Sequence, residues 1–180
     1  VLVDWLPWNH TFGGNYTFNI ALCHGGTMYI DQGKPMPGAF DLTLKNLREM
    51  SPTIYFNVPR GFELLLPHLE EDVAFRKHFF SKCRFVLYAG ASLPVSVWQR
   101  LEKLGQQECN GELILASSWG STETAPMCMG SHAGNTTLGT IGLPVPGCEL
   151  KLVPNAGKLE ARVRGPNITR GYLNAPEASS

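Results

Sequence analysis

Apolar runs alternate with amphipathic stretches along the first two-thirds of the chain. Five short apolar runs, bounded by glycine, proline or polar residues, are typical of strands: 1–7, 27–31, 52–58, 83–90 and 111–117. The stretches between them have helical periodicity: 12–26, 39–50, 60–80 and 94–105. Proline and glycine predict a helix break at Pro67, a helix start at Pro94 and a helix end at Gly105.

This order of elements predicts an α/β fold. Helical crossovers between successive strands favour a parallel, doubly wound sheet with flanking helices. From Gly134 onward the chain becomes rich in glycine and proline, with short alternating runs typical of strands. We therefore expect a central α/β subdomain over residues 1–133 and the start of a small β-rich subdomain, incomplete, over residues 134–180.

Composition and charge exclude several classes of protein. The 180 residues carry 15 Lys+Arg and 15 Asp+Glu, so the basic excess of a nucleic-acid binder is absent and we expect no nucleic-acid partner. No apolar run approaches the roughly 20 residues of a membrane span. The five cysteines include no CxxC pair, and no signal peptide is recognisable. These features favour a reducing compartment, and we expect a cytoplasmic protein.

Three polar loops follow predicted strands and would share one edge of a parallel sheet. They are "PWNHTFGG" (7–14), "YAGASLP" (88–94) and "SSWGSTETAP" (117–126). Ligands of open parallel sheets bind beyond the carboxyl ends of the strands, so the three loops predict a binding site at that edge.

The third loop has the side chains that a nucleotide needs. Trp119 offers a flat face for a ring, and Gly120 allows close approach of the backbone. The Thr122 hydroxyl can donate to a phosphate oxygen, and the Glu123 carboxylate suits Mg²⁺. The same residues also fit a capped helix start, with Ser121 or Thr122 as N-cap. Since the chain has no GxxxxGK[ST] loop, composition leaves both interpretations open.

Other candidate chemistry is less specific. His10 lies between tryptophan and phenylalanine in the sequence, which fits a structural histidine as well as a catalytic one. The absence of GxSxG argues against a serine hydrolase, and the absence of GxGxxG after the first strand argues against a Rossmann-type dehydrogenase.

Five segments, in order, resemble the adenylate-forming superfamily of acyl- and aryl-CoA synthetases. They cover nearly the whole chain: "LPWNHTFGG" (6–14), "YAGASLP" (88–94), "SSWGSTETAP" (117–126), "GTIGLPVPGCELKLV" (139–153) and "GKLEARVRGPNITRGYLNAPE" (157–177). The stretch "DWLPWNHTFGGN" (4–15) is most similar to the bacterial feruloyl-CoA synthetase-like branch.

The resemblance implies a ligase that joins a carboxylate to AMP, using ATP and Mg²⁺, and then transfers the acyl group to CoA. It implies catalytic roles for His10, Thr122 and Glu123, with Glu123 as the metal ligand. Nucleotide binding would fall to Gly90, Ala91, Ser92, Ser118, Trp119, Gly120 and Thr122. The acyl pocket would comprise His10, Phe12, Gly13 and Ser118, to which we add Trp8 and Tyr55 as aromatic walls.

Several parts of the family pattern are missing from these residues. They are the Ser/Thr/Gly-rich phosphate loop, the later segment whose aspartate holds the ribose, and the C-terminal domain with its lysine. We therefore expect a central fragment that is inactive by itself. The expected substrate is a hydroxycinnamate-type acid; a medium- or long-chain fatty acid, or a non-catalytic nucleotide- or acyl-binding module of the same fold, are the alternatives.

Overall fold

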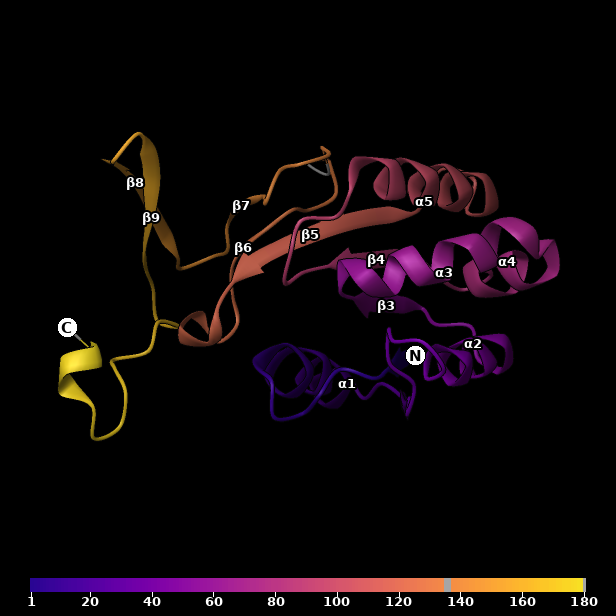
Figure 1. Ribbon diagram of the computed structural model, residues 1–180, viewed down its shortest axis with the longest axis horizontal. Coiled ribbons are helices and arrows are strands. Elements are labelled where there is room, and N and C mark those ends of the chain that lie inside the picture. The colour runs from indigo at the N-terminus through magenta and orange to yellow at the C-terminus, as the bar shows by residue number, and fades with distance from the viewer. Residues whose placement is uncertain (135–136, 180) are drawn as a thin grey trace.

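Strands and helices alternate through most of the chain (Figure 1). The computed structural model describes residues 1–134 and 137–179. The first part contains β1 (Leu2–Asp4), the π-helix η1 (Phe12–Phe18), α1 (Asn19–Cys23), β2 (Met28–Ile30), α2 (Phe40–Glu49), β3 (Ile54–Asn57), α3 (Pro59–Glu71), α4 (Val73–Phe80), β4 (Phe85–Tyr88), α5 (Val95–Glu108) and β5 (Ile114–Gly120). All five predicted strands are present, and the α/β fold class is confirmed.

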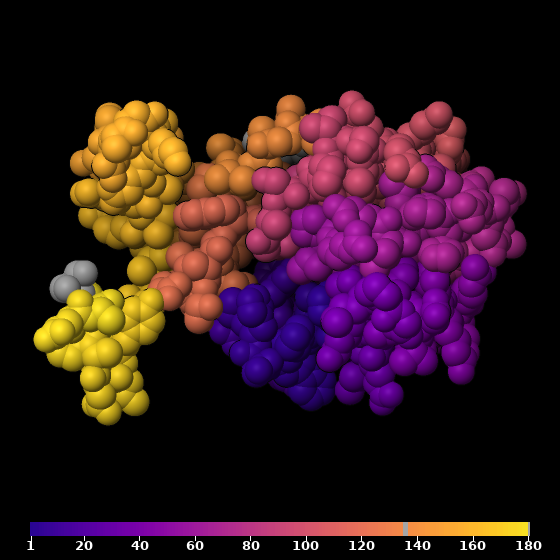
Figure 2. Space-filling view, viewed as in Figure 1, coloured from indigo at the N-terminus to yellow at the C-terminus, as the bar shows by residue number. Residues whose placement is uncertain are grey.

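The rest of the chain is mainly β-structure. It contains the 3₁₀ turn η2 (Thr122–Thr124), β6 (Met127–Gly130), β7 (Leu143–Pro144), β8 (Glu149–Asn155), β9 (Lys158–Arg164) and the 3₁₀ turn η3 (Pro176–Ser179). Figure 2 shows the β8–β9 ribbon and the C-terminal segment as two protrusions at one end of the main body. Strand β7 pairs with β6 of the central sheet, so the chain returns to that sheet after Gly134, before the ribbon begins. The division at 133/134 stays a prediction.

The central sheet is mixed: the predicted strands within it are parallel as expected, and two further antiparallel strands extend it. Its order is β3-β4-β5-β6-β7, in which β3, β4 and β5 are parallel while β6 and β7 are antiparallel to their neighbours. Strands β1 and β2 form a separate parallel pair. The connection from β5 to β6 is only the η2 turn, which is too short for the crossover that a parallel strand requires.

The three parallel strands are buried on both faces. Tyr55, Val86 and Leu115 face the large core, which also contains apolar side chains of α2, α3, α4 and α5. Their neighbours in the strands belong to a second core with Leu2, Leu6 and residues of η1: Phe56, Leu87 and Ala116. Figure 1 shows α3, α4 and α5 lying together along the strands. Because both faces of these strands are buried, their sequences are nearly continuous runs of apolar residues and do not alternate with polar ones.

Two helix boundaries differ from the sequence prediction. Pro67 lies inside α3, and the break comes at Asp72, whose carboxylate accepts a hydrogen bond from the Phe75 amide at 2.9 Å and so caps α4. Gly105 lies inside α5 rather than at its end. A Cβ at Gly105 would lie 2.0 Å from Leu113 Cδ2, so close packing explains this glycine.

Within residues 1–134 and 137–179, the search for a helix with the length and apolarity of a membrane span found none.

Two buried aspartates lie at the ends of the β1–β2 pair: Asp4 is the last residue of β1, and Asp31 directly follows β2. Asp31 accepts hydrogen bonds from Gly33, Thr43 and Asn46 at 2.8, 2.6 and 2.8 Å. Asp4 Oδ1 accepts a hydrogen bond from the Leu6 amide at 3.2 Å, and its Oδ2 is buried without a hydrogen-bond partner in the described part of the chain. Burial raises the pKa of Asp4 to about 6, and the nearby Asp31 also raises it.

Asp4→Asn should therefore stabilise the protein at pH 7.5 but not at pH 4. With the pKa of Asp4 raised from 3.8 to about 6, the folded state holds a proton that the unfolded chain releases. The contribution of Asp4 to stability thus falls as the pH rises from about 4 to about 6, and above pH 6 it stays unfavourable by about 3 kcal/mol. Thermal unfolding of both proteins across this pH range measures the difference.

The matched control is Asp41→Asn, on the exposed first turn of α2. It should change the unfolding midpoint little, and by the same amount at both pH values. A gain for Asp4→Asn that persists at pH 4 would contradict the assignment of the effect to this carboxyl group.

Candidate functional site

A cavity of about 600 Å³ opens where β4 and β5 end. Residues of all three polar loops line it, together with residues 126–127 after η2 and residues 139–141. Strands β4 and β5 run in register from Phe85↔Ile114 to Tyr88↔Ser117. The loop after β4 therefore lies beside the last residues of β5, which continues to Gly120, as expected for a ligand site at the carboxyl edge.

Most of the predicted site residues line this cavity. The structure brings together His10, Phe12, Gly90, Ala91, Ser92, Ser118, Trp119, Gly120, Thr122 and Glu123. Three others, Trp8, Gly13 and Tyr55, are not among its lining residues, and their assignment to the acyl pocket stays a prediction.

Trp8 and Gly13 lie outside the cavity for different reasons. Trp8 is 54% exposed, and its ring packs against Phe18 with 5.2 Å between centroids. Gly13 is buried against the backbone of the preceding loop, where a Cβ would lie 2.4 Å from the Pro7 carbonyl oxygen. This glycine thus allows η1 to pack closely on the loop, which is a structural role.

Tyr55 belongs to the opposite face of β3. It is 1% exposed and packs edge-on against Phe62 and Phe79, while its hydroxyl accepts a hydrogen bond from Asn57 Nδ2 at 2.8 Å. The neighbouring Phe56 faces η1 instead, with its centroid 6.5 Å from that of Phe12. The alternation of side chains along a strand could have given this result from the sequence.

Tyr16 is a wall residue that the sequence analysis missed. It lies one helical turn after Phe12, and the two ring centroids are 6.0 Å apart. Burial raises the pKa of its phenol, which stays neutral at physiological pH. Tyr16, Ser117 and Met127 line the main cavity and also a second cavity of about 280 Å³. They therefore stand between the two cavities.

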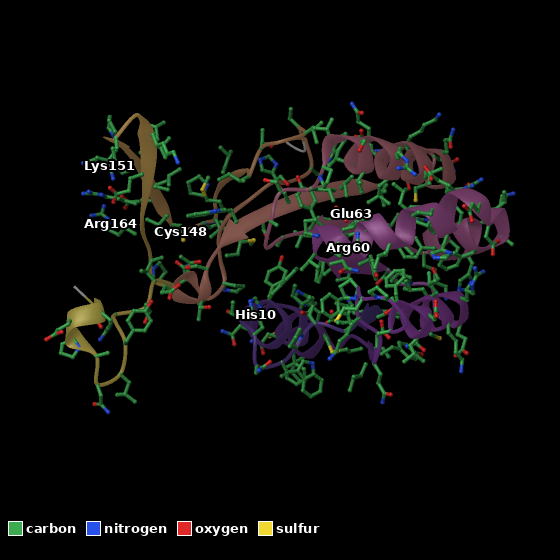
Figure 3. The ribbon with its side chains drawn as sticks, viewed as in Figure 1. His10, Arg60, Glu63, Cys148, Lys151 and Arg164 are labelled. Atoms are coloured by element: carbon green, nitrogen blue, oxygen red, sulfur yellow. The ribbon has the colours of Figure 1, made fainter. Side chains whose placement is uncertain are left out.

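His10 offers a hydrogen-bond donor to the cavity. Its Nδ1 accepts a hydrogen bond from the Phe12 amide at 3.1 Å. The neutral ring therefore carries its proton on Nε2, and the residue is exposed. Figure 3 shows His10 on the N-terminal segment, toward the end of the molecule from which the β8–β9 ribbon projects. Held in this way, the imidazole can donate to an anionic group of a ligand.

The η2 turn satisfies its own capping requirement without Thr122. Ser121 is the N-cap, and its amide donates to Thr124 Oγ1 at 2.8 Å in a capping box. Within the described residues the Thr122 hydroxyl has no hydrogen-bond partner, and Thr122 is exposed in the cavity wall. The capped-turn interpretation is therefore correct for Ser121, and it leaves Thr122 available for a ligand.

Glu123 is an ionised carboxylate at the cavity. Its Oε1 accepts a hydrogen bond from the Tyr172 hydroxyl, and this bond lowers the pKa of Glu123. The described residues contain no cluster of three or more His, Cys, Asp or Glu side chains that could hold a metal. Mg²⁺ commonly takes one or two protein carboxylates and fills its remaining positions with phosphate oxygens and water. A single carboxylate in the cavity wall fits that mode of binding.

Comparisons with known proteins agree on one family. The model of the AMP-binding enzyme family matches residues 1–173. The chain is 28% identical over 178 residues to 3-[(3aS,4S,7aS)-7a-methyl-1,5-dioxo-octahydro-1H-inden-4-yl]propanoyl:CoA ligase of Rhodococcus jostii strain RHA1, covering 97% of this chain and 31% of the relative. It is 29% identical over 161 residues to anthranilate–CoA ligase of Pseudomonas aeruginosa, covering 85% and 28%. It is 28% identical over 188 residues to a long-chain-fatty-acid–CoA ligase of Bacillus subtilis strain 168, covering 97% and 30%.

Solved structures show the same similarity. A malonyl-CoA ligase with methylmalonyl-CoA and AMP bound superposes with a TM-score of 0.76 at 28% identity, covering 99% of this chain and 37% of that one. A benzoate CoA ligase from Burkholderia xenovorans LB400 has a TM-score of 0.79 at 22% identity, covering 99% and 35%, which shows a shared fold. The chain spans about a third of the length of the curated relatives it matches.

Proposed function

The chain belongs to the AMP-binding enzyme family, and we propose that it forms the nucleotide- and acyl-binding wall of an ATP-dependent acyl- or aryl-CoA ligase. The observation that carries the proposal is the composition of the cavity. The cavity lining brings together an indole face, a hydroxyl without a hydrogen-bond partner among the described residues, an ionised carboxylate and an imidazole N–H, from Trp119, Thr122, Glu123 and His10. These are the groups that an acyl-adenylate needs around it.

The nucleotide half of the proposed site lies between the loop after β4 and the end of β5 with the η2 turn. In the proposal the adenine lies between Gly90, Ala91 and Ser92 on one side and Trp119 on the other, since an indole packs well on a flat ring. Gly90 has φ +87°, a conformation that other residues rarely adopt. The Thr122 hydroxyl donates to an oxygen of the α-phosphate.

The acyl half lies at η1. His10 Nε2–H donates to the substrate carboxylate, and Phe12, Tyr16 and Ser118 bound the acyl group. A carboxylate oxygen attacks the α-phosphorus of ATP and the bond to pyrophosphate breaks, which gives acyl-AMP. The CoA thiol then attacks the acyl carbon, AMP leaves, and the thiol proton passes to solvent. These side chains contribute positioning and stabilisation of charge.

Glu123 would hold Mg²⁺ in this site. When bound, the cation would neutralise part of the negative charge of the phosphates. The tests below use the full-length protein, since residues 1–180 by themselves are expected not to turn over.

Two substrate classes fit the acyl half. The similarity of residues 4–15 to feruloyl-CoA synthetase-like proteins, with Phe12 and Tyr16 as flat walls, favours a hydroxycinnamate-type acid. The second cavity behind Tyr16 favours a fatty acid, whose chain would extend into it. We propose the hydroxycinnamate as substrate and the fatty acid as the alternative.

Glu123→Gln should slow adenylation at low Mg²⁺ by at least roughly 10-fold, with partial recovery at high Mg²⁺. The amide keeps the shape of the side chain but loses the charge that a hard cation prefers. Pyrophosphate release across a Mg²⁺ series measures this effect. Glu71→Gln, at the exposed end of α3, is the control and should behave as wild type. An unchanged Mg²⁺ dependence in the Glu123 variant would show that Glu123 is not a metal ligand.

A panel of acids distinguishes the two substrate classes. For a flat slot, kcat/KM should be highest with cinnamates and low with saturated C10–C12 acids. For an open tunnel, binding should gain roughly 0.8 kcal/mol for each added methylene. Measuring kcat/KM for cinnamates and for C6–C14 acids decides between them, and a steady rise with chain length would exclude the hydroxycinnamate assignment.

Tyr16→Ala should shift the preference toward longer acids, because it removes the ring that separates the two cavities. We expect the ratio of kcat/KM for a C12 acid to that for a cinnamate to rise by roughly 10-fold, about the value of two buried methylenes. Tyr16→Phe keeps the ring and should leave the ratio near that of wild type. An unchanged ratio in the alanine variant would show that Tyr16 does not limit the acyl pocket.

A further inference from the structure

The η2 turn is held by a segment that lies more than 40 residues later in the chain. Four hydrogen bonds join residues 167–172 to residues 123–127. In Figure 1 this segment passes beside η2, between the β8–β9 ribbon and the C-terminal η3 turn. The turn that carries Thr122 and Glu123 has only three residues, so these outside contacts bear on where the two side chains lie.

Asn167 makes the central contacts. Its Nδ2 donates to the carbonyl oxygens of Thr124 and Met127, at 2.7 and 3.1 Å. Its Oδ1 accepts a hydrogen bond from Cys148 Sγ at 2.9 Å, and Figure 3 shows Cys148 at the base of the β8–β9 ribbon. Both amide hydrogens and the amide oxygen are therefore used. Aspartate at this position would lack the donors and would place negative charge against two carbonyl oxygens.

Glu123 itself is held at both its backbone and its side chain. The Thr169 amide donates to the Glu123 carbonyl oxygen at 2.8 Å, and the Tyr172 hydroxyl donates to Glu123 Oε1. Glu123 is also among the residues that line the cavity. One segment therefore fixes the backbone of this turn and the orientation of its carboxylate.

We propose that Asn167 and Tyr172 are positioning residues that act through the η2 turn, so that Thr122 and Glu123 meet the Mg²⁺–nucleotide in a fixed geometry. The inference rests on the proposed function, since it takes the cavity as a nucleotide site. A purely structural role for these contacts would change stability without changing nucleotide affinity selectively.

The test compares Asn167→Ala, Asn167→Asp and Tyr172→Phe in the full-length protein. Tyr29→Phe, which removes a hydroxyl from an exposed tyrosine on β2, is the control. Hydrogen–deuterium exchange of the ligand-free protein should show faster exchange in residues 121–127 of the Asn167 variants. Calorimetric titration with ATP and Mg²⁺, without an acid, should show affinity weakened by roughly 10-fold in Asn167→Ala and Tyr172→Phe. The KM for the acid should stay within about two-fold of wild type.

A double-mutant cycle identifies the route of the effect. If Tyr172 acts through the Glu123 carboxylate, Tyr172→Phe should have little further effect on ATP affinity in the Glu123→Gln background. Additive effects of the two substitutions would overturn the inference for Tyr172, and wild-type exchange and ATP affinity in the Asn167 variants would overturn it for Asn167. If wild type binds no ATP and releases no pyrophosphate with any acid, the proposed function fails as well. If wild type is active while the variants match it, only this inference fails.

Discussion

The register of β4 against β5 is the constraint on which the candidate site depends. Because the two strands are parallel and their pairing stops at Tyr88↔Ser117, the loop that carries Gly90 and the last residues of β5, which include Trp119, leave this pairing at the same level. The second core then fixes the third wall, since Phe12 packs on Phe56 and thereby holds the start of η1 at the cavity. A slip of one residue would turn the side chains of a strand to the opposite face and separate these walls.

The short loop after β5 divides its polar groups between structure and ligand. Ser121 and Thr124 satisfy each other in the capping box, and Thr124 is buried. Thr122 is left without a hydrogen-bond partner within the described residues, while Glu123 is oriented by Tyr172. A loop of this composition can thus be both a capped turn and a binding surface, because different residues carry the two roles.

The sequence patterns correctly predicted features that depend on neighbouring residues. They failed for features that depend on packing between distant parts of the chain. Each of the five apolar runs corresponds to a strand in the structure. Residues of the three polar loops line the cavity. Gly105 looked like a helix end, but contact with Leu113 requires a glycine inside α5. Tyr55 was assigned to the pocket from its residue type, whereas in the structure it packs in the large core. The contact of Tyr172 with Glu123 spans 49 residues, and no local pattern could reveal it.

The charge of the cavity wall explains why a cation belongs to the proposed site. Among the described residues the lining contains the Glu123 carboxylate and no lysine or arginine. A nucleotide phosphate close to this carboxylate would be repelled by about 1 kcal/mol at 4 Å in water, and by more where the cavity excludes water. Hydroxyl donors such as Thr122 offset part of that repulsion but carry no net charge. Mg²⁺ held by Glu123 would supply positive charge against the phosphate, so in the proposed site the carboxylate would favour nucleotide binding only together with the cation.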